Sequence, residues 1–406
     1  MTAPILSNSP ARRELALRLG VASLVLLIVC LPLAHVVALR TVGLLLAVAC
    51  AGFLSCHPAE NQPRSWPLAW VFALWLGAAL LSLHSSPAMA RTLTEIWDEI
   101  VKSALLFYAA YAIARNRSNA RVWFLAAAAS LLLLSSFAII AWLLAGSWQA
   151  VGPVPALGDF NTSAITLLPL LALPVFAHWR QPLGWVALPL AAVTAILTLT
   201  AAALSLSRSF WLVSAIMLIS ATLVWSWKKQ RAWQTAMRWV GGGLALLALL
   251  AFLVGRWRGL DLLYFNSRSV IYGPVLNHLQ SAPLTGFGYG HESAQAWYRT
   301  HMVEAGVLHA HNIVLSYAEQ MGLAGLFAIF GIFGGLGGRL FRRISDRNPY
   351  RASLAAIGLA LVAGVFVKNN LDIFFTRHNL LLFFLCCGVL LGAAESEADQ
   401  APAAGP

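Results

Sequence analysis

The chain has 406 residues, of which 60% are hydrophobic and 10% are charged, and its mean hydropathy is +0.75. These values lie outside the range of soluble domains, so they exclude a soluble enzyme and predict an integral membrane protein with an all-α, polytopic fold. The formal net charge of +12 is then expected to reflect how the loops are placed about the membrane rather than a nucleic-acid partner.

The apolar segments predict the number of membrane-spanning helices. A spanning helix needs about 20 mostly apolar residues, and by this criterion the chain contains about twelve transmembrane helices. The expected spans are 17–33, 37–55, 66–83, 101–114, 122–145, 163–177, 183–204, 210–227, 239–254, 313–340, 352–367 and 380–391.

The stretch before the fourth span predicts a short interfacial helix. Leu93 and Trp97 belong to a helical apolar stripe, and Glu95, Asp98 and Glu99 lie opposite it. We expect these three acidic side chains to form a solvated face.

The basic residues predict the orientation of the chain. With both termini cytoplasmic, 17 of the 27 lysines and arginines lie on the inner side, as the positive-inside rule requires. The basic residues that precede the first apolar run resemble a signal peptide, but no convincing cleavage site follows, so we expect an uncleaved first span. The ten outer basic residues are Arg40, Arg91, Lys102, Arg208, Arg256, Arg258, Arg268, Arg299, Lys368 and Arg377.

One connection is much longer than the others. Residues 255–311 form an outer loop in this topology, and the loop carries half of the ten histidines. The predicted division is therefore 1–254 with spans one to nine, 255–311 as the long loop, 312–394 with spans ten to twelve, and 395–406 as a cytoplasmic tail.

Two outer arginines have unusual surroundings. Arg208, in LTAAALSLSRSFWL, joins two nearly continuous spans, so it is expected at the membrane surface with an anionic partner. Arg268, in FNSRSVIYG, lies deeper in the long loop, and the glycines of SAPLTGFGYG follow it. That glycine pattern favours a tight turn over a phosphate loop, because no strand precedes it and no Walker lysine follows. Snorkelling to lipid headgroups is the alternative for the arginines next to spans.

The stretch HAHNIVLSYAEQMGLAG begins the tenth expected span with His309, His311 and Asn312. A helix N-terminus disfavours an added positive charge, so a histidine there stays neutral and can act as a general base. At 100° per residue, Gly322 returns to within about 20° of the face of His311 and Gly325 to within about 40°. We expect these glycines to let a neighbour approach closely and to fix the helix tip. Alternatively, Asn312 caps the helix and His311 is merely interfacial.

Two further polar residues are supporting candidates. Glu319 is predicted about two turns below His311 and about 80° round the helix, where it can orient a neighbour. Lys368, together with Arg377 and His378, is expected on another outer loop, where it either supplements a site or snorkels. The five cysteines have no metal-binding spacing and the outer side has no Asp-x-Asp, so no disulfide, metal or other cofactor is expected.

These residues carry a resemblance to a known family. The string His311-Asn312, nine residues and then GLAG is similar to the motif of bacterial O-antigen ligases. Ser207-Arg208 at a span end, and Arg268 before the PLTGFGYG turn, resemble the other two marks of the O-antigen ligase and polymerase superfamily. The resemblance is detailed over about residues 200–325 and rests on topology elsewhere. Tyr272 stands where relatives often carry Trp, and we expect this to matter little.

The resemblance implies a membrane glycosyltransferase of the C type in the inner membrane of a Gram-negative bacterium. It would move a polysaccharide from undecaprenyl diphosphate to lipid A-core oligosaccharide on the periplasmic side, with inversion and without a metal. Arg208 and Arg268 would bind the diphosphate and His311 would be the base. Three alternatives remain: an O-antigen polymerase, a protein O-oligosaccharyltransferase, and, from another class, a transporter. The polar residues cluster at outer ends rather than at the midplane and no internal repeat is visible, which disfavours a transporter.

Overall fold

The computed structural model describes residues 10–58, 66–117, 119–146, 160–174, 186–205, 207–228, 241–242, 245, 249, 252–253, 269–301, 310–371, 375 and 377–396. This part of the chain is built from helices and contains no β-strand. The helices are α1 Pro10–Cys30, α2 Val37–Cys56, α3 Ala69–Ser82, η1 Leu83–Ser85, α4 Met89–Glu95, η2 Ile96–Val101, α5 Lys102–Asn116, α6 Ala120–Ala145, α7 Phe160–Leu167, η4 Leu168–Ala172, α9 Ala187–Leu204, α10 Arg208–Lys228, α12 Ser269–Ser281, α13 His291–His301, α14 Ile313–Ile344, α15 Pro349–Leu371 and α16 Arg377–Ala394.

Six of the described helices are long and apolar enough to cross a membrane: α2, α6, α9, α14, α15 and α16. Shorter apolar helices occupy 69–85, 160–172 and 209–222. Every expected span other than the ninth coincides with a helix, whereas 239–254 lies mostly outside the described residues. The fold is therefore that of a polytopic α-helical membrane protein, and the number of twelve spans stays a prediction.

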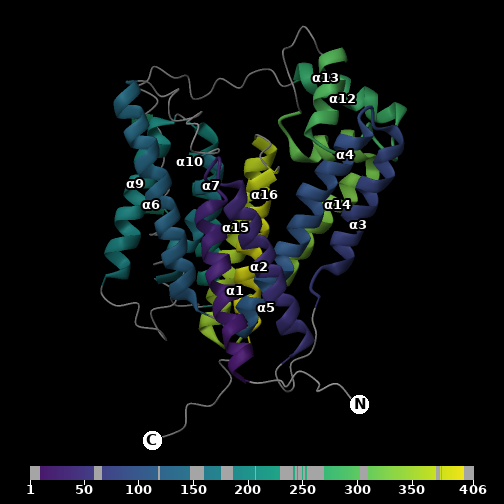
Figure 1. Ribbon diagram of the computed structural model, residues 1–406. Helices are drawn as coiled ribbons and strands as arrows, with labels where there is room; N and C mark the ends of the chain where they lie inside the picture. The colour runs from purple at the N-terminus through teal and green to yellow at the C-terminus, as the bar shows by residue number, and fades with distance from the viewer. Residues whose placement is uncertain are drawn as a thin grey trace, which may run out of the picture.

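The most buried helix of the bundle is α16, which packs against α5 and α15. Glycines allow its close contact with α5, because a Cβ atom at Gly388 would lie 2.6 Å from the carbonyl oxygen of Phe107 and one at Gly392 would lie 2.4 Å from that of Tyr111. Small residues at such crossings let two membrane helices approach backbone to backbone. Around this centre, α6 and α9 lie on one side and α3 and α14 on the other (Figure 1).

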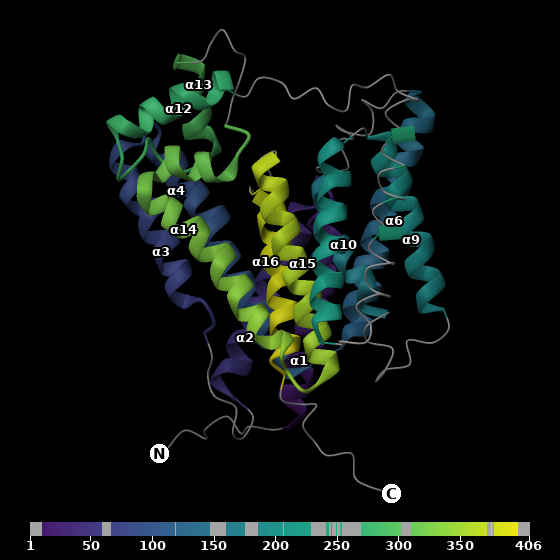
Figure 2. The same ribbon diagram turned by 180° about the vertical axis from the view of Figure 1, so that it is seen from behind.

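The start of α1 and the end of α16 lie at the same end of the bundle. Arg117, after α5, pairs with Glu14 of α1 at 2.9 Å, and Arg339 near the end of α14 pairs with Glu395 at 2.9 Å. At the opposite end, α12 and α13 lie over one side of the bundle, next to α4 and α14 (Figure 2). The long connection expected as a loop thus contains two helices, which lie at the end away from both termini of the described chain.

Three expectations about local structure are wrong. The segment before α5 does not have a uniformly solvated acidic face, because Glu99 is 4% exposed and faces inward, whereas the apolar Leu93 and Trp97 are about half exposed. The helix α14 is not straight, because Gly322 has φ 63° and ψ −152° and breaks it. Lys368 does not lie on a loop, because it is buried in the last turn of α15.

Candidate functional site

The start of α14 is fixed by a side-chain cap. The Asn312 side chain accepts a 3.1 Å hydrogen bond from the backbone N–H of Leu315, and Asn312 itself is extended, as an N-cap residue should be. His311 therefore stands one residue outside the helix, and its φ of 52° is left-handed. Because the backbone at residue 311 is not helical, the His311 side chain does not share a helical face with Gly322 and Gly325, and that expectation is wrong. The half-buried imidazole instead sits on a turn that ends at a capped helix.

The break in α14 is filled by the glycine-rich turn. The backbone N–H groups of Phe287 and Gly288 donate to the carbonyl oxygens of Glu319 and Gln320, at 2.9 and 3.1 Å. In return, the N–H of Leu323 donates to the carbonyl of Pro283 at 2.8 Å. These bonds satisfy backbone groups that a broken helix would otherwise leave unpaired. The turn therefore supports the outer part of α14 in the way that another helical turn would.

The glycines of this junction are required by close contact. A Cβ at Gly286 would lie 2.3 Å from the carbonyl oxygen of Glu319, and one at Gly322 would lie 2.4 Å from the carbonyl carbon of Leu284. Both residues also have positive φ, which glycine adopts without strain. The expectation that Gly322 admits a close neighbour is confirmed, but the neighbour is the glycine turn and not another helix. The glycine-rich segment is thus a tight turn that supports α14, as its sequence pattern predicted.

Glu319 is fully buried beneath this junction. Its carboxylate accepts a 2.7 Å hydrogen bond from the Tyr298 hydroxyl of α13 and a 3.2 Å bond from the Ser316 hydroxyl of α14. A buried carboxylate is expensive unless such donors satisfy it. The contact therefore joins α13 to the first turns of α14, and a supporting role of Glu319 in the site stays a prediction.

A second carboxylate network lies on the other face of the glycine turn. Glu99 accepts hydrogen bonds from the Tyr289 hydroxyl at 2.8 Å and from the backbone N–H of Arg377 at 2.9 Å. Glu95 accepts one from the N–H of Glu292 at 3.2 Å. Both precede the apolar segment that begins at Val101, and burial raises the pKa of each carboxyl to about 7. A Cβ at Gly290 would lie 1.5 Å from a carboxylate oxygen of Glu95, so this network too depends on a glycine.

The two carboxylate networks are connected through aromatic rings. The ring of Tyr289 packs edge-on against that of Tyr317 with centroids 6.3 Å apart, and Tyr317 stacks on Trp75 at 6.2 Å. Tyr317 lies in the first turns of α14, one turn after the cap. The glycine turn, its tyrosine and the two carboxylates thus hold α14 against α3 and the segment from Ser86 to Val101.

The expected diphosphate-binding residues are only partly described. Arg208 is the first residue of α10, three residues after the C-cap of α9, as the sequence indicated. Nearby, the Ser205 hydroxyl donates to the Asn161 side chain at 2.8 Å, and the hydroxyls of Ser207 and Ser209 lie 3.2 Å apart. The backbone position of Arg208 is described but its side chain is not.

Arg268 and His309 lie outside the described residues. Arg268 directly precedes α12, which packs against α14. Tyr272 of α12 is half-buried and packs, with Leu315, against a small cluster that includes Phe287 and Trp297. Its position in this cluster makes Tyr272 a packing residue at the junction of α12, α13 and α14.

Lys368 belongs to the α10 side of the bundle. Helices α10 and α15 pack antiparallel, and a Cβ at Gly364 would lie 2.2 Å from the end of the Met217 side chain. Gly364 and Met217 therefore mark the same depth in the bundle. Lys368 lies one turn, or about 6 Å, outward of Gly364, whereas Arg208 lies about 13 Å outward of Met217. The buried Lys368 is therefore more than one turn deeper than the start of α10, with a side chain 3% exposed.

Sequence reasoning missed the tyrosines of this site. Tyr289 and Tyr298 bind the buried carboxylates Glu99 and Glu319, yet they lie far away in the sequence and on the long connection. For Glu319 the available signal was the presence of an acid inside an apolar run, because a carboxylate there needs a donor. The identity of that donor is set by the tertiary fold.

The described part of the chain is an all-helical membrane protein with several candidate spans, and the buried carboxylates Glu99 and Glu319 lie at the end where α12 and α13 are found. Residues 193–330, about a third of the chain, match the protein family described as O-antigen ligase. The match confirms the resemblance to the O-antigen ligase and polymerase superfamily, whose members are membrane enzymes of the glycosyltransferase type. It includes Arg208, Arg268, His311 and the break at Gly322. No curated protein matches the chain.

Proposed function

We propose that the protein is an O-antigen ligase, which transfers a polysaccharide from undecaprenyl diphosphate to lipid A-core oligosaccharide. The match at 193–330 supports the superfamily, and one observation favours catalysis at His311: the residue stands before a capped helix whose outer part is held by the glycine turn. A group held in this way keeps its geometry during the reaction, which is a large part of catalytic power.

In the proposed reaction, His311 takes the proton of a sugar hydroxyl on the acceptor while the hydroxyl oxygen attacks the anomeric carbon of the donor. The bond from that carbon to the diphosphate oxygen breaks, undecaprenyl diphosphate leaves with the electron pair, and the anomeric centre inverts. Arg208 and Arg268 stabilise the charge that develops on the diphosphate, since a guanidinium binds phosphate oxygens in forked geometry. The reaction needs no metal and no other cofactor, so transfer by the purified enzyme is expected to survive EDTA.

The proposed setting is the inner membrane of a Gram-negative bacterium, with both termini cytoplasmic and the α12–α13 end in the periplasm. The fold is proposed to be that of a C-type membrane glycosyltransferase with about twelve spans. The basic residues Arg117, Arg339 and Arg343, which lie with both described termini at the other end of the bundle, support this orientation.

The lipopolysaccharide of a deletion strain tests the proposal. Loss of a ligase leaves lipid-linked polymer in the membrane and the lipid A-core without polysaccharide, and the wild-type gene restores the capped form. Lipid A-core that still receives the glycan, now as single repeats without polymer, would assign the protein as a polymerase instead. Normal lipopolysaccharide together with loss of protein glycosylation would assign a protein O-oligosaccharyltransferase. Movement of substrate across liposomes without a new glycosidic bond would assign a transporter.

A further inference from the structure

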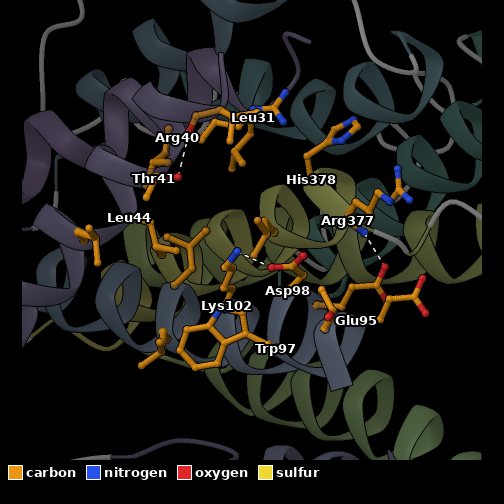
Figure 3. Close-up of a pocket in the computed structure, with 18 of the residues that line it drawn as sticks. Leu31, Arg40, Thr41, Leu44, Glu95, Trp97, Asp98, Lys102, Arg377 and His378 are labelled. Carbon is orange, nitrogen blue, oxygen red and sulfur yellow. Dashed lines mark hydrogen bonds and ion pairs between the residues drawn. The ribbon is translucent and has the colours of Figure 1, made fainter. Parts of the chain in front are cut away.

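A cavity of about 880 Å³ lies between α2, α5 and the outer end of α16 (Figure 3). One wall is apolar and includes Leu31, Val37, Leu44, Leu45 and Leu105. Val37 and Leu45 are about two-thirds exposed. Exposed apolar side chains of this kind face hydrocarbon in a membrane protein, so this wall suits the acyl chains of a lipid.

The other end of the cavity is polar and adjoins a second cavity of about 540 Å³. The two cavities share Arg91, Glu292 and Arg377, and the second also includes Arg299. Arg91 and Glu292 form an ion pair. The second cavity therefore has three guanidinium groups and one carboxylate, which gives it a surplus of positive charge.

The remaining acidic groups belong to the larger cavity, and they offset part of that surplus because Glu95 and Glu99 both interact electrostatically with Arg377. Asp98 pairs with Lys102. Glu99 accepts from the Tyr289 hydroxyl and from the Arg377 backbone, and Glu95 accepts from the Glu292 backbone. Within the described part of the chain, Arg299 donates a hydrogen bond to the neutral side chain of Gln295, at 3.3 Å, and forms no ion pair. An anion in the smaller cavity would meet Arg299 and Arg377 without displacing an ion pair of either side chain among the described residues.

The cavity is separate from the proposed diphosphate-binding side. Helix α10, which begins at Arg208, packs on α15 and α7, whereas the cavity is lined by α2, η2, α5 and α16. In both views, α10 and α4 lie on opposite sides of α16 (Figures 1 and 2). The cavity is nevertheless linked to the start of α14 by a chain of contacts. Glu99 at its polar end accepts a hydrogen bond from Tyr289, and the ring of Tyr289 packs on Tyr317 of α14.

We propose that this cavity binds the acceptor, as a phosphorylated and multiply acylated glycolipid. Its phosphate lies against Arg91, Arg299 and Arg377, and its acyl chains run along α2 and α5. The class of ligand follows from the arginine-rich end and the adjoining open apolar wall. Its assignment as acceptor rests on the proposed function: an enzyme that joins two lipid-linked substrates needs two lipid-facing sites, and the donor arginine Arg208 is on the other side of α16.

Binding of lipid A to the full-length protein in nanodiscs of zwitterionic lipid tests the polar end. Arg299→Gln with Arg377→Gln is expected to weaken binding about tenfold or more, a loss of about 1.4 kcal/mol or more, because each substitution removes a charged donor to the phosphate. Arg121→Gln, which changes an exposed arginine at the far end of the bundle, is the matched control and should bind normally. Unchanged affinity in the double variant would overturn the proposal.

A second pair of variants tests the apolar wall without altering charge. Leu45→Trp fills part of the cavity and should weaken lipid A binding, whereas Ile196→Trp, on the exposed face of α9, should not. Equal binding by the two tryptophan variants, each confirmed as folded by an unchanged thermal midpoint, would contradict the proposed position of the acyl chains.

Undecaprenyl diphosphate binding, measured on the same preparations, separates this proposal from the proposed function. We expect the double arginine variant to keep donor affinity, and in a transfer assay to raise KM for the acceptor but not for the donor. Loss of donor binding with intact lipid A binding would make this the donor site and overturn the inference. Arginine-dependent binding of lipid A by a protein that transfers no glycan would instead refute the ligase assignment and retain the lipid site.

Discussion

The backbone N–H of Phe287 donates a 2.9 Å hydrogen bond to the carbonyl oxygen of Glu319, in the middle of the break in α14. The bond joins the glycine turn to the helix that begins just after His311. A membrane helix normally satisfies its own backbone, and a break is tolerated only where other protein groups replace the missing bonds. The turn supplies those groups, so the position of His311 depends on residues that precede it on the long connection.

Gly322→Ala should destabilise the protein. The backbone at Gly322, with φ 63° and ψ −152°, is in a region that essentially only glycine occupies, where strain costs about 1–3 kcal/mol, and the added Cβ would also collide with Leu284. We expect a lower thermal midpoint of the purified protein. Gly334→Ala in the same helix is the control, since a Cβ there meets nothing within 4 Å. Equal midpoints for the two variants would show that the break is not required.

Glu319 and Tyr298 should act as a coupled pair. Tyr298→Phe removes the 2.7 Å donor to a buried carboxylate, so we expect a loss of stability and a slower transfer. In a Glu319→Gln background the same change should cost less, with a coupling energy of about 0.5–3 kcal/mol in a double-mutant cycle. Tyr272→Phe, on α12, provides a control hydroxyl deletion. If the losses of unfolding free energy from the two substitutions were strictly additive, the Tyr298–Glu319 hydrogen bond would not connect α13 to α14.

Arg208→Ala and Arg268→Ala should each abolish transfer while the protein still inserts into the membrane. Lysine at either position should rescue poorly, because its point charge lacks the planar fork that binds a diphosphate. The measurement is transfer and undecaprenyl diphosphate affinity at matched expression, with Arg121→Ala as an arginine deletion far from this end. Normal activity of both alanine variants would remove the diphosphate role.

The α12–α13 end is expected to face the periplasm. After replacement of the exposed Cys56 by serine, a cysteine at Gln295 should react with an impermeant reagent once the outer membrane alone is permeabilised. A cysteine at the exposed Ser345, at the end of α14, should react only after the inner membrane is opened. The reverse pattern would invert the proposed topology.

The sequence predicted the helices well because long apolar runs have few alternatives in a membrane, and helix ends at Asn312 and Leu204 followed from capping and composition. It could not predict the break at Gly322, since a glycine in an apolar helix is equally consistent with a smooth packing face. The inward orientation of Glu99 was not predicted either, because the segment before α5 was expected to be an interfacial helix with water on its acidic side. Only the tertiary fold places Tyr289 there.

The ligase assignment depends most directly on His311, and one measurement tests it: transfer rate and donor affinity of His311→Ala and His309→Ala in parallel preparations. A general base contributes about 10² to 10⁴ in rate and little to ground-state binding. We therefore expect His311→Ala to lose most transfer with donor affinity nearly unchanged, and His309→Ala to be milder. Transfer by His311→Ala at the normal rate, or a failure caused only by lost donor binding, would contradict the account and make His311 a binding or turn residue.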